Sequence, residues 1–416
     1  MKILLATFWP LPMVGGVWSY VQALYQALTN MDYEVDILSH HPNEKKYHII
    51  NDGRSINKAL ITNSVQKIIQ PFFKSSHPDM YFIAKYETER YGFEAAAAYF
   101  DLKKYDLIHT QDVISARALS RVKPKETPLI STLHGCYTFE YIRHVKKAVT
   151  ESELQKWKQT FISRYFATTE HYGANASNVT IVPTQWLKNL LKNEFNIPKE
   201  KFKVVPYGID IKDFIKKMEV QTEKPPPAAN IIIGCPARLD RVKGHQFLLE
   251  ALAKLKHQRN DWICWFIGNG SLLKELKNYA RNLGIEEHIV FLGNRNDVPA
   301  LLKNLDLIVL PSLQDNHPFA LMEAQIAGKP IVTTDAGGIP EMVTHDKTGL
   351  ICPKGDSDIL YQNIKRVIEN KTLSNRLSAA AKEQAMHNWP IDRMINRTLA
   401  IYRQFTEDGQ HGEKEE

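Results

Sequence analysis

The segment from residue 310 to residue 350 constrains the fold of this chain most strongly. It follows an apolar run, residues 305–310, which is typical of a buried parallel strand. A polar loop at residues 314–317 comes next, and a helix is predicted over Phe319–Ala327. Another apolar strand is predicted over residues 330–333. This order predicts a unit of the α/β class in which a loop and a helix N-terminus lie at the carboxyl end of a parallel strand.

The same segment predicts a site for a ligand that carries both phosphate and hydroxyl groups. Free backbone N–H groups and the helix dipole favour an anion at the start of the helix. Asp315 lies in the loop and Glu323 inside the helix, and no cation accompanies them in the local sequence. Carboxylates accept hydrogen bonds from sugar or ribose hydroxyls. The residues predicted to face the phosphate are Asn316, His317, Pro318, Phe319, Ala320 and Leu321.

Four motifs in this segment carry a family resemblance. PS-x-x-D-x7-E, GKPIV, DAGGIPE and TGL are similar to the donor-site signature of family 4 retaining glycosyltransferases. The first acidic position is normally Glu in that family, and Asp315 stands there in this chain. The resemblance implies the glycosyltransferase B (GT-B) fold, an α/β architecture of two Rossmann-like domains facing each other across a crevice. It also implies transfer of a hexose-type sugar, with retention, from a nucleotide sugar (UDP-sugar) to an acceptor hydroxyl in glycan, glycolipid or polysaccharide synthesis.

Composition excludes several other classes. The 416 residues carry a net charge of +7, without a basic, aromatic-rich module of the kind that binds nucleic acid. Four separated cysteines form no C-x-x-C pair, so we expect small buried residues in a reducing cytosol. No segment approaches the roughly 20 apolar residues that span a bilayer. We therefore expect a cytoplasmic protein. A peripheral contact with the inner face of the membrane is the alternative, because acceptors in this family are often lipid-linked.

The N-terminus reads as a strand–loop–helix–strand unit. Strands are predicted over Lys2–Phe8 and Tyr33–Ser39, with a helix over Val17–Thr29 between them. Gly15 and Gly16 precede the helix, and glycine content alone leaves a tight turn and a ligand role equally open. The family resemblance favours the ligand role, in which the backbone approaches the donor phosphate.

The rest of the first half is less regular. Helices are predicted near residues 55–73 and 86–100. Strands over residues 105–110 and 128–133 follow, and the second ends at His134, at the edge where open α/β sheets bind ligands. A lone histidine is often only packed. The resemblance implies that His134 contacts the donor hexose.

Beyond His134 the sequence predicts a helix, a strand and a linker. One long helix is predicted over residues 151–171, with a short strand at 167–169 as the alternative. A strand follows at residues 179–182. VVPYGID, residues 204–210, resembles the hinge between the two domains of the family. Residues 211–230 are polar and contain three consecutive prolines, so a linker with little structure of its own is predicted.

The second half alternates strands and helices. Arg238 and Lys243 follow its first strand, and a guanidinium with an ammonium at that edge suits a diphosphate. Gly293 and Asn294 follow a later strand and resemble the segment whose backbone meets the nucleotide base. The strands are predicted over residues 231–235, 262–267, 289–291, 307–310 and 331–333.

A D-x-D motif at Asp356 and Asp358 imitates a metal site. It lies directly before a helix predicted over residues 359–370, so Asp356 is interpreted as a helix cap. We expect neither a metal nor a cofactor, because the nucleotide sugar is a substrate.

The predicted organisation has two domains. Residues 1–206 form the acceptor-binding domain and residues 207–389 the domain that binds the nucleotide sugar. A final helix over residues 390–405 crosses back to the first domain, as in the family. Residues 406–416 are predicted to be a disordered tail.

The resemblance assigns the chemistry to five residues and leaves two rivals. His134, Arg238, Lys243, Asp315 and Glu323 form the candidate catalytic set. No side-chain base is required by the sequence, so the departing diphosphate is expected to take the acceptor's proton. The first rival is a non-catalytic sugar-nucleotide-binding or scaffold protein descended from such an enzyme. The second, a glucan synthase using ADP-glucose, usually has a Lys before its glycine pair, where this chain has Met13 and Val14.

Overall fold

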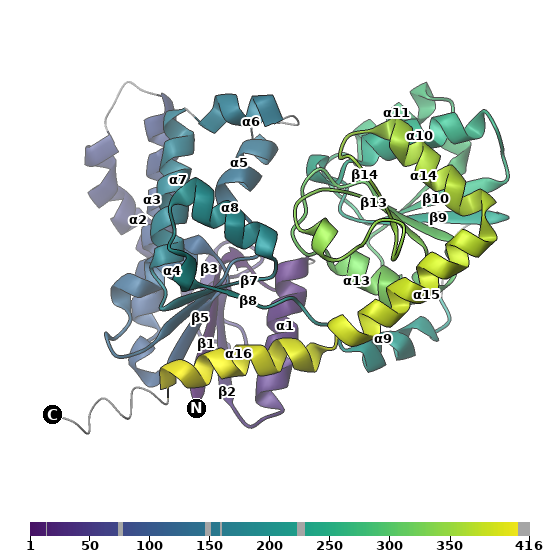
Figure 1. The fold of residues 1–416 in the computed structure, drawn as a ribbon. Helices are drawn as coiled ribbons and strands as arrows, with labels where there is room; N and C mark the ends of the chain where they lie inside the picture. The colour runs from purple at the N-terminus through teal and green to yellow at the C-terminus, as the bar shows by residue number, and fades with distance from the viewer. Residues whose placement is uncertain (14, 74–77, 146–150, 159, 223–228, 407–416) are drawn as a thin grey trace. The chain divides into compact units, whose positions relative to one another are not determined.

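A computed structural model describes residues 1–416 except 14, 74–77, 146–150, 159, 223–228 and 407–416 (Figure 1). The chain divides into two compact units, one of residues 1–205 with residues from 395 onward, and one of residues 206–394. Each unit is built on its own largely parallel sheet with helices packed against it. The predicted fold class, two Rossmann-like α/β domains, is confirmed.

The first unit contains an eight-stranded sheet. Its order is β4-β3-β2-β1-β5-β6-β7-β8, parallel except at the β2–β3 and β3–β4 pairs. The strands are β1 Lys2–Pro10, β2 Glu34–His40, β3 Lys46–Ile49, β4 Ser55–Asn57, β5 Leu107–Thr110, β6 Leu129–Thr132, β7 Val179–Val182 and β8 Phe202–Val204. The α-helices are α1 Gly16–Thr29, α2 Lys58–Ile69, α3 Pro78–Tyr99, α4 Val113–Val122, α5 Tyr137–Val145, α6 Glu151–Lys158, α7 Phe161–Asn175, α8 Gln185–Phe195 and α16 Ile391–Thr406. Short 3-10 helices are η1 Gln70–Phe73, η2 Leu102–Lys104 and η3 Lys199–Lys201.

Successive side chains of β1 point to opposite faces of the sheet and are apolar, which explains why helices cover both faces. Leu4 and Ala6 belong to a large core that also contains buried residues of α3, α4 and α7. Ile3 and Leu5 point to the opposite face and are equally buried. A central strand that is buried on both sides reads as a continuous apolar run, which is how the sequence shows it.

Residues 40–104 differ from the prediction. The helix expected near residues 55–73 forms as α2, but it is shorter than predicted, because β4 takes its first residues and the 3-10 helix η1 its last, and β3 precedes them. Both extra strands are short and antiparallel at the sheet edge, so they lack the apolar run of a central strand. The helix expected from residue 86 begins at Pro78.

The long helix expected over residues 151–171 is also wrong. The chain forms α6 and α7 instead, and the Thr160 side chain accepts a hydrogen bond from the Ser163 N–H to cap α7. The alternative strand at residues 167–169 lies inside α7. Local propensity is similar on both sides of the break, so the cap residue is the only sequence signal for it.

The C-terminal helix α16 joins the first unit through a buried polar network. His109 on β5 lies 2.6 Å from the Tyr402 hydroxyl through Nδ1 and 2.7 Å from Thr132 Oγ1 through Nε2. The Tyr20 hydroxyl lies 3.3 Å from the same Thr132 oxygen. Burial lowers the pKa of His109 to about 3, so its ring is neutral. The predicted tail from residue 407 lies outside the described residues, and Thr406 is the last residue of α16.

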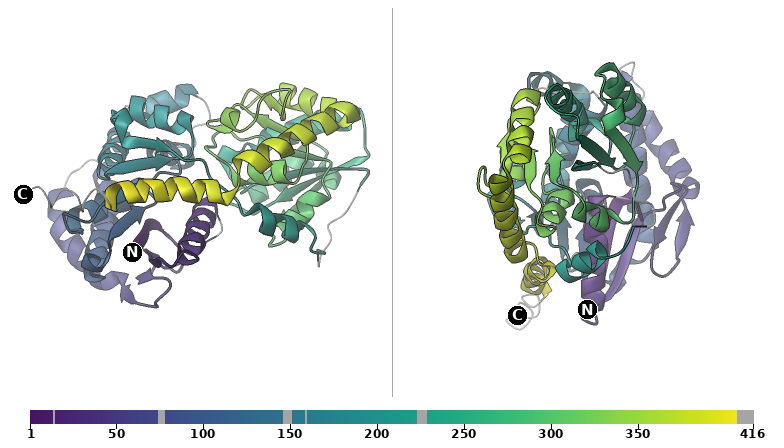
Figure 2. Two further views of the ribbon diagram at one scale, coloured as in Figure 1. Left: turned by 60° about the horizontal axis from the view of Figure 1, so that its bottom comes forward. Right: turned by 90° about the vertical axis from the view of Figure 1, so that its right-hand side faces the viewer.

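The second unit contains a six-stranded parallel sheet of order β11-β10-β9-β12-β13-β14 (Figure 2). Its strands are β9 Ile231–Pro236, β10 Trp262–Ile267, β11 Ile289–Gly293, β12 Leu307–Leu310, β13 Ile331–Thr334 and β14 Leu350–Cys352. The α-helices are α9 Ile211–Met218, α10 His245–Lys256, α11 Leu273–Asn282, α12 Val298–Lys303, α13 Phe319–Ile326, α14 Ser357–Glu369 and α15 Lys371–Asn388. The 3-10 helices are η4 Arg241–Lys243, η5 Glu286–His288 and η6 Ile339–Glu341. The first five strands are those predicted, and β14 adds an edge.

The predicted linker over residues 211–230 is partly helical. Asp210 caps α9, since its side chain accepts a hydrogen bond of 2.9 Å from the Asp213 N–H. Ile211 and Phe214 bury one face of the helix. Ile211, Phe214, Ile215 and Met218 have the i, i+3, i+4, i+7 spacing of an amphipathic helix, so the helix signal was present in the sequence and the prolines that follow were given too much weight. The prolines lie outside the described residues.

Two composition-based expectations concern cysteine and the membrane. Cys136, Cys235, Cys264 and Cys352 are all free and buried, as predicted. In the part of the chain that the structure describes, no helix combines the length and apolarity needed to cross a bilayer.

Candidate active site

The parallel sheet of the second unit brings most of the predicted site residues to one edge. Arg238 and Lys243 follow β9, Gly293 ends β11, Asp315 follows β12 and Gly337 follows β13. Because the strands are parallel, their carboxyl ends lie along the same edge. Residues separated by up to 99 positions in the sequence therefore contribute to one row of loops.

An ion pair joins two of these loops. Lys243 Nζ lies 2.6 Å from Asp315 Oδ2, and the Ser312 hydroxyl donates to the same oxygen at 3.1 Å. The Lys243 and Asp315 side chains are only 19% and 14% exposed. The sequence-based inference that the Asp315 carboxylate has no cation to neutralise it is therefore wrong, because the cation lies 72 residues away in the chain.

Backbone contacts hold the Asp315 loop from both sides. The Leu313 N–H donates to the Val242 carbonyl at 2.7 Å, and the Gly338 N–H donates to the Asp315 carbonyl at 3.0 Å. A Cβ at Gly337 would lie 1.8 Å from that carbonyl oxygen, and the residue has a φ of +59°. Only glycine permits this approach and this backbone conformation. The GG pair of the DAGGIPE motif therefore fixes the loop that carries Asp315.

The N-terminus of α13 lies in the same row of loops. Pro318 is its N-cap and provides no side-chain hydrogen bond to the first turn. Pro318, Phe319 and Ala320 are partly exposed, so the first N–H groups of the helix lie at the surface of the unit. Glu323, one turn further on, is half-buried, and burial raises the pKa of its carboxyl group to about 7.

Two predicted phosphate-facing residues are instead buried in the unit. Asn316 and His317 are 9% and 5% exposed. The His317 ring packs edge-on against Tyr207 at 5.1 Å and Trp389 at 5.0 Å between ring centroids. Burial lowers the pKa of His317 to about 3, so the ring is a neutral packing group. These contacts hold the start of α13 in place.

Arg238 has the freedom that a ligand-binding cation needs. Its side chain is 61% exposed and lies 3.2 Å from Asp240 Oδ2. Asp240 itself is buried. The guanidinium is thus held at one end by a buried carboxylate while its other donors face solvent.

The remaining second-unit predictions concern a turn and a cap. Gly293 has a φ of +66° and is followed by the exposed Asn294, so the backbone turns sharply at the end of β11. Asp356 caps α14 as predicted, accepting hydrogen bonds from the Asp358 and Ile359 N–H groups at 3.0 and 2.9 Å. The Asp358 carboxylate pairs with Lys254 at 2.6 Å. Among the described residues there is no group of three or more His, Cys, Asp or Glu side chains that could hold a metal.

The first unit brings Gly15, Gly16 and His134 to the carboxyl ends of β1 and β6. Gly15 precedes α1 with a φ of 156°, and Gly16 is the first residue of the helix. His134 Nε2 lies 3.1 Å from Gln111 Oε1, and its ring packs on Tyr20 at 4.9 Å. Burial lowers the pKa of His134 to about 3. Gln111 is a positioning residue that sequence reasoning missed, although it directly follows a predicted strand.

A second missed residue orders the loop after His134. The Glu170 carboxyl group on α7 accepts hydrogen bonds from the Thr138 N–H at 2.9 Å and the Thr138 hydroxyl at 3.1 Å. Glu170 is fully buried, and its Oε1 has no hydrogen-bond partner. Burial raises the pKa of Glu170 to about 8, so the group is mostly protonated at neutral pH.

Comparison with known proteins identifies the class of this fold and site. The model of the family described as "Glycosyl transferases group 1" matches residues 217–384, and that of "Glycosyltransferase Family 4" matches residues 14–213. Between them the two models cover both units. The fold is that of a glycosyltransferase with the GT-B fold.

The chain belongs to family 4 of the glycosyltransferases, the group 1 family, as the motifs predicted. It is therefore a glycosyltransferase, an enzyme that transfers a sugar from a nucleotide-sugar donor. An uncharacterized glycosyltransferase of Methanocaldococcus jannaschii is 24% identical over 419 residues, covering 97% of this chain and 98% of the relative.

Two further comparisons name ligands or substrates of other proteins. The UDP-Gal:alpha-D-GlcNAc-diphosphoundecaprenol alpha-1,3-galactosyltransferase of Escherichia coli is 25% identical over 308 residues, covering 72% of this chain and 76% of the relative. The crystal structure of Anabaena HepE in complex with UDP has the same fold, with a TM-score of 0.65 at 19% identity over 97% of this chain and 100% of that one.

Glu170 predicts a specific dependence of stability on pH. Its pKa is raised in the folded protein, so the folded state holds a proton that the unfolded state loses above about pH 4.5. The stability that Glu170 contributes is complete below that pH and is lost as the pH rises toward 8. In wild type the free energy of unfolding should fall by on the order of 1 kcal/mol per pH unit in this window. Glu170→Gln should remove that slope.

The measurement is the difference in melting temperature between Glu170→Gln and wild type at pH 5, 6, 7 and 8. The melting temperature of Glu170→Gln should rise relative to that of wild type as the pH rises. Glu200→Gln, at an exposed position of the same unit, serves as the control. A difference for Glu170→Gln that stays constant across the four pH values would contradict the assignment.

Proposed function

We propose that this enzyme transfers a hexose from a UDP-sugar, with retention at the anomeric carbon, to a hydroxyl of a carbohydrate or lipid-linked acceptor. The observation that carries the proposal is the Lys243–Asp315 ion pair. It places a cation for phosphate and a carboxylate for sugar hydroxyls at one point, in the same row of loops as the open N-terminus of α13.

The donor diphosphate would bind to fixed positive groups. Lys243 is held by Asp315, so it does not have to be ordered from a flexible state when the ligand arrives, and the largely exposed Arg238 can reach the ligand from its place beside Asp240. The N–H groups of Phe319, Ala320 and Leu321 add the helix dipole. The positive charge thus comes from the protein, and the proposal needs no metal.

The rest of the donor is assigned by hydrogen-bonding capacity. Glu323 would accept from the ribose hydroxyls and Asp315 from the hexose hydroxyls, because a carboxylate offers several acceptor sites. Gly293 and Asn294 would meet the base through the backbone turn that ends β11. These residues all belong to the second unit, to which the nucleotide sugar is assigned.

The first unit would supply the remaining contacts. Gly15 and Gly16 would let the backbone approach the donor phosphate, since no Cβ stands in the way. His134, held neutral between Gln111 and Tyr20, would contact the donor hexose. Acceptor binding is also assigned to this unit.

The chemical step needs stabilisation of the leaving charge more than it needs a nucleophile. The bond from the anomeric carbon to the diphosphate oxygen breaks, leaving an oxocarbenium-like sugar and a diphosphate with an additional negative charge. Arg238, Lys243 and the start of α13 stabilise that charge. The acceptor oxygen then bonds to the anomeric carbon on the face that the diphosphate leaves, and the diphosphate takes the acceptor's proton.

Relatives support the choice of donor and acceptor. HepE has been solved with UDP and, in another crystal, with UDP-glucose. The name of the Escherichia coli relative specifies a UDP-galactose donor and a lipid diphosphate acceptor. The rival interpretation, a non-catalytic descendant, finds no support at the site, since both cations and both carboxylates are in place. Sustained release of UDP from a UDP-sugar, as opposed to donor binding alone, would separate the two.

Lys243→Ala tests the diphosphate assignment. Removing one charge-assisted partner of a desolvated phosphate should raise the barrier by about 2–4 kcal/mol, which lowers kcat/KM by roughly two to three decades. The measurement is donor turnover with melting temperature followed in parallel. Lys254→Ala is a matched control, because Lys254 also pairs with an aspartate at 2.6 Å, but at 37% and 75% exposure. Equal turnover in the two variants would overturn the assignment.

Asp315→Glu tests the role of the shorter carboxylate. Asp has one methylene fewer than the Glu usual in the family, which draws its oxygens back by about 1.5 Å. A hydrogen bond cannot stretch that far. Asp315 must therefore contact the sugar hydroxyl in a different geometry or through a bridging water. The variant should therefore change the ratio of kcat/KM values among UDP-glucose, UDP-galactose and UDP-N-acetylglucosamine. Asp315→Ala should lose most activity with every donor. Wild-type turnover of Asp315→Ala would show that the carboxylate does not read the sugar.

Metal independence is the third expectation, because the protein itself provides the charge at the diphosphate. Donor turnover should be the same in excess EDTA as in buffer with Mg²⁺ or Mn²⁺. A heat-inactivated sample with each ion gives the background. Loss of turnover in EDTA that returns on adding either ion would contradict this.

A further inference from the structure

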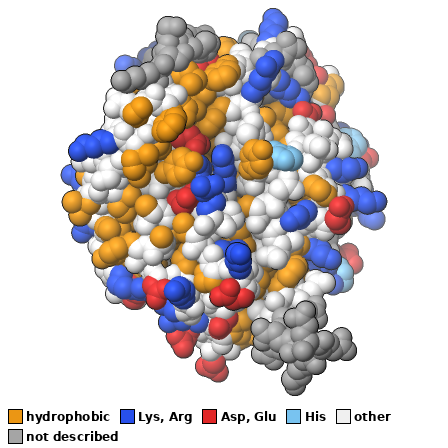
Figure 3. Space-filling model, turned by 90° about the vertical axis from the view of Figure 1, so that its left-hand side faces the viewer, with side chains coloured by type: hydrophobic (Ala, Val, Ile, Leu, Met, Phe, Trp, Pro, Cys, Tyr) orange, Lys and Arg blue, Asp and Glu red, His pale blue; other side chains and the backbone are white. Residues whose placement is uncertain are grey.

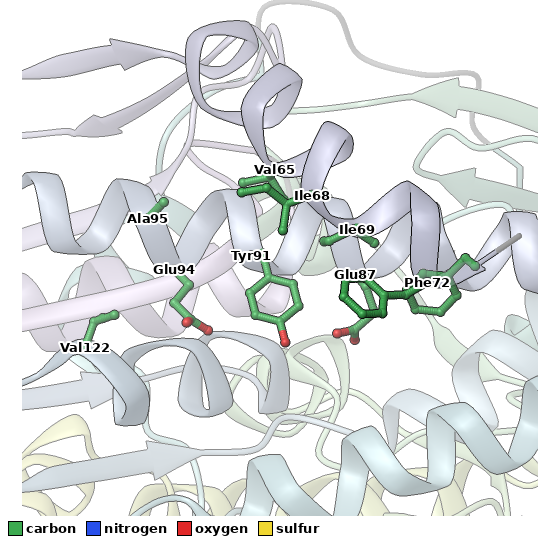
Figure 4. A pocket seen from close by; sticks show the side chains of 10 residues that line it. Val65, Ile68, Ile69, Phe72, Glu87, Tyr91, Glu94, Ala95 and Val122 are labelled. Carbon is green, nitrogen blue, oxygen red and sulfur yellow. The ribbon is translucent and has the colours of Figure 1, made fainter.

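The first unit contains an apolar pocket whose two carboxylates are already paired. It has a volume of about 580 Å³ and lies between α2, η1, α3 and the end of α4, with Glu87 and Glu94 along α3 (Figure 4). Figure 3 shows hydrophobic side chains gathered across the upper part of one face of the molecule. Arg90 lies 2.6 Å from Glu87 and 3.1 Å from Glu94, and Arg121 lies 3.1 Å from Glu94. The pocket therefore identifies no ligand by its charge.

In the second unit, the turn after β11 is held at its first residue. This turn, residues 293–297, is called the base turn below. The pairing of β10 with β11 is irregular just before Gly293, because β11 carries one extra residue there. Gly293 forms an isolated antiparallel bridge with Gly268. A Cβ at Gly268 would lie 2.3 Å from the carbonyl oxygen of Ala237, the residue before Arg238. The base turn is thus joined through the Gly268 loop to the loop of the predicted diphosphate contact.

Three side chains hold the other end of the base turn. Arg295 Nε donates to Asp297 Oδ1 at 2.7 Å, and Arg295 Nη2 donates to Asp297 Oδ2 at 2.5 Å. Arg295 Nη2 also donates to the Thr222 hydroxyl at 2.8 Å, and that hydroxyl donates to Asp297 Oδ2. Thr222 follows α9, in the stretch predicted to be a linker without structure of its own. An ion pair of 2.6 Å between Glu219 and Lys303 fastens the same stretch to α12. Thr222, Arg295 and Asp297 are called the brace below.

The charges of the brace cancel, which distinguishes Arg295 from the predicted diphosphate contact Arg238. The Arg295 and Asp297 side chains are only 15% and 23% exposed, whereas Arg238 is 61% exposed. The hydrogen bond from Arg295 lowers the pKa of Asp297 to about 2, so Asp297 is ionised at neutral pH. A bidentate pair of this kind fixes the orientation of the guanidinium. Arg295 is thus committed to holding the turn.

Asp297 makes these contacts in place of an ordinary structural role. It is the N-cap residue of α12, where an aspartate side chain normally accepts a hydrogen bond from the first turn of the helix. Its side chain makes no such bond in α12. The carboxylate is directed to Arg295 and Thr222 instead, so local helix stability is given up for a fixed turn.

We propose that Thr222, Arg295 and Asp297 are positioning residues for the nucleobase of the donor. This inference rests on the proposed function, in which the backbone at Gly293 and Asn294 meets the base. Backbone groups select a base only when they are held in one place, because a mobile turn would have to be ordered when the ligand binds. The brace and the Gly268 bridge hold the base turn at its two ends before the ligand arrives. The Thr222 hydroxyl therefore contributes to binding of the base and not to binding of the diphosphate.

Thr222→Val tests the inference, because it replaces the hydroxyl by a methyl group of similar size. The probes are UDP and inorganic pyrophosphate, which has no base, and their Kd values are measured by calorimetry on the full-length protein. Thr222→Val should weaken UDP binding at least fivefold and pyrophosphate binding less than twofold. Thr222→Ser keeps the hydroxyl and should bind UDP within twofold of wild type. Thr372→Val, the same change at an exposed position of the same unit, is the matched control.

Asp297→Asn tests whether the brace acts as one unit. It removes the charge that holds Arg295 and should also weaken UDP binding at least fivefold. Because both changes release the same turn, the double variant with Thr222→Val should bind UDP only about as weakly as the weaker single variant. Factors that multiply in the double variant would show that the two residues act separately.

Three results would overturn the inference: equal UDP binding by Thr222→Val and wild type, equal weakening of UDP and pyrophosphate by Thr222→Val, or equal UDP binding by Thr222→Val and Thr222→Ser. Circular dichroism and melting temperature show that each variant is folded. Wild-type protein that binds neither UDP nor a UDP-sugar would overturn the proposed function, and this inference with it. Wild-type protein that binds UDP, with Thr222→Val unaffected, would overturn only the role of the brace.

Discussion

The ion pair between Lys243 and Asp315 is the interaction on which the arrangement of the candidate site depends. It joins the loop after β9 to the loop after β12 at 2.6 Å, in a region where neither side chain is more than one-fifth exposed. A partly buried charge without a partner would destabilise the fold by several kcal/mol, so each of the two side chains stabilises the charge of the other. The pair also explains why the surrounding backbone is so constrained. Gly337 lies against the Asp315 carbonyl at a distance that no Cβ permits. The loops are therefore preorganised by the protein, and a ligand that brings its own phosphate and hydroxyls has only to replace solvent.

Other acidic groups are accommodated in a different way. Glu170 is fully buried, and burial keeps it largely protonated at neutral pH. In this form it serves as a hydrogen-bond acceptor for the Thr138 N–H and hydroxyl. The loop between His134 and α5 is thus ordered by a largely neutral carboxyl group. The histidines follow the same rule, since burial lowers the pKa of both His109 and His134 to about 3. The predicted hexose contact in the first unit, His134, is thus a neutral group, whereas the predicted diphosphate contacts in the second unit, Arg238 and Lys243, are cations.

The sequence predicted the elements whose signal is local and failed where the signal is long-range or weak. Buried parallel strands such as β9 and β12 appear as apolar runs, and the fold class followed from their alternation with helices. Helix α9 was missed although its apolar residues, Ile211, Phe214, Ile215 and Met218, have helical spacing, because the proline-rich segment after it was taken to extend over the whole stretch. At the site, the row of loops could be predicted, since parallel strands share an edge. The pairing of Lys243 with Asp315 could not, because 72 residues separate them and only the register of the sheet brings them together. His317 was expected to face the ligand. The packing of its ring on Tyr207 and Trp389 could not be predicted, because both residues are distant in the sequence.

Glu323 shows how the site could change its charge with its ligand. Burial raises the pKa of its carboxyl group to about 7, so near neutral pH it is poised between the neutral and the charged form. The other carboxylate of the motif, Asp315, is ion-paired with Lys243 instead. Hydroxyl groups that donate to a carboxylate stabilise its charged form, so ribose binding at Glu323 would lower its pKa and release a proton. The diphosphate brings negative charge at the same time, which acts in the opposite direction. Donated hydroxyl hydrogen bonds would favour the charged form of Glu323 and the diphosphate charge its neutral form, so the proposed ligand would act on the protonation of Glu323 in two opposite ways.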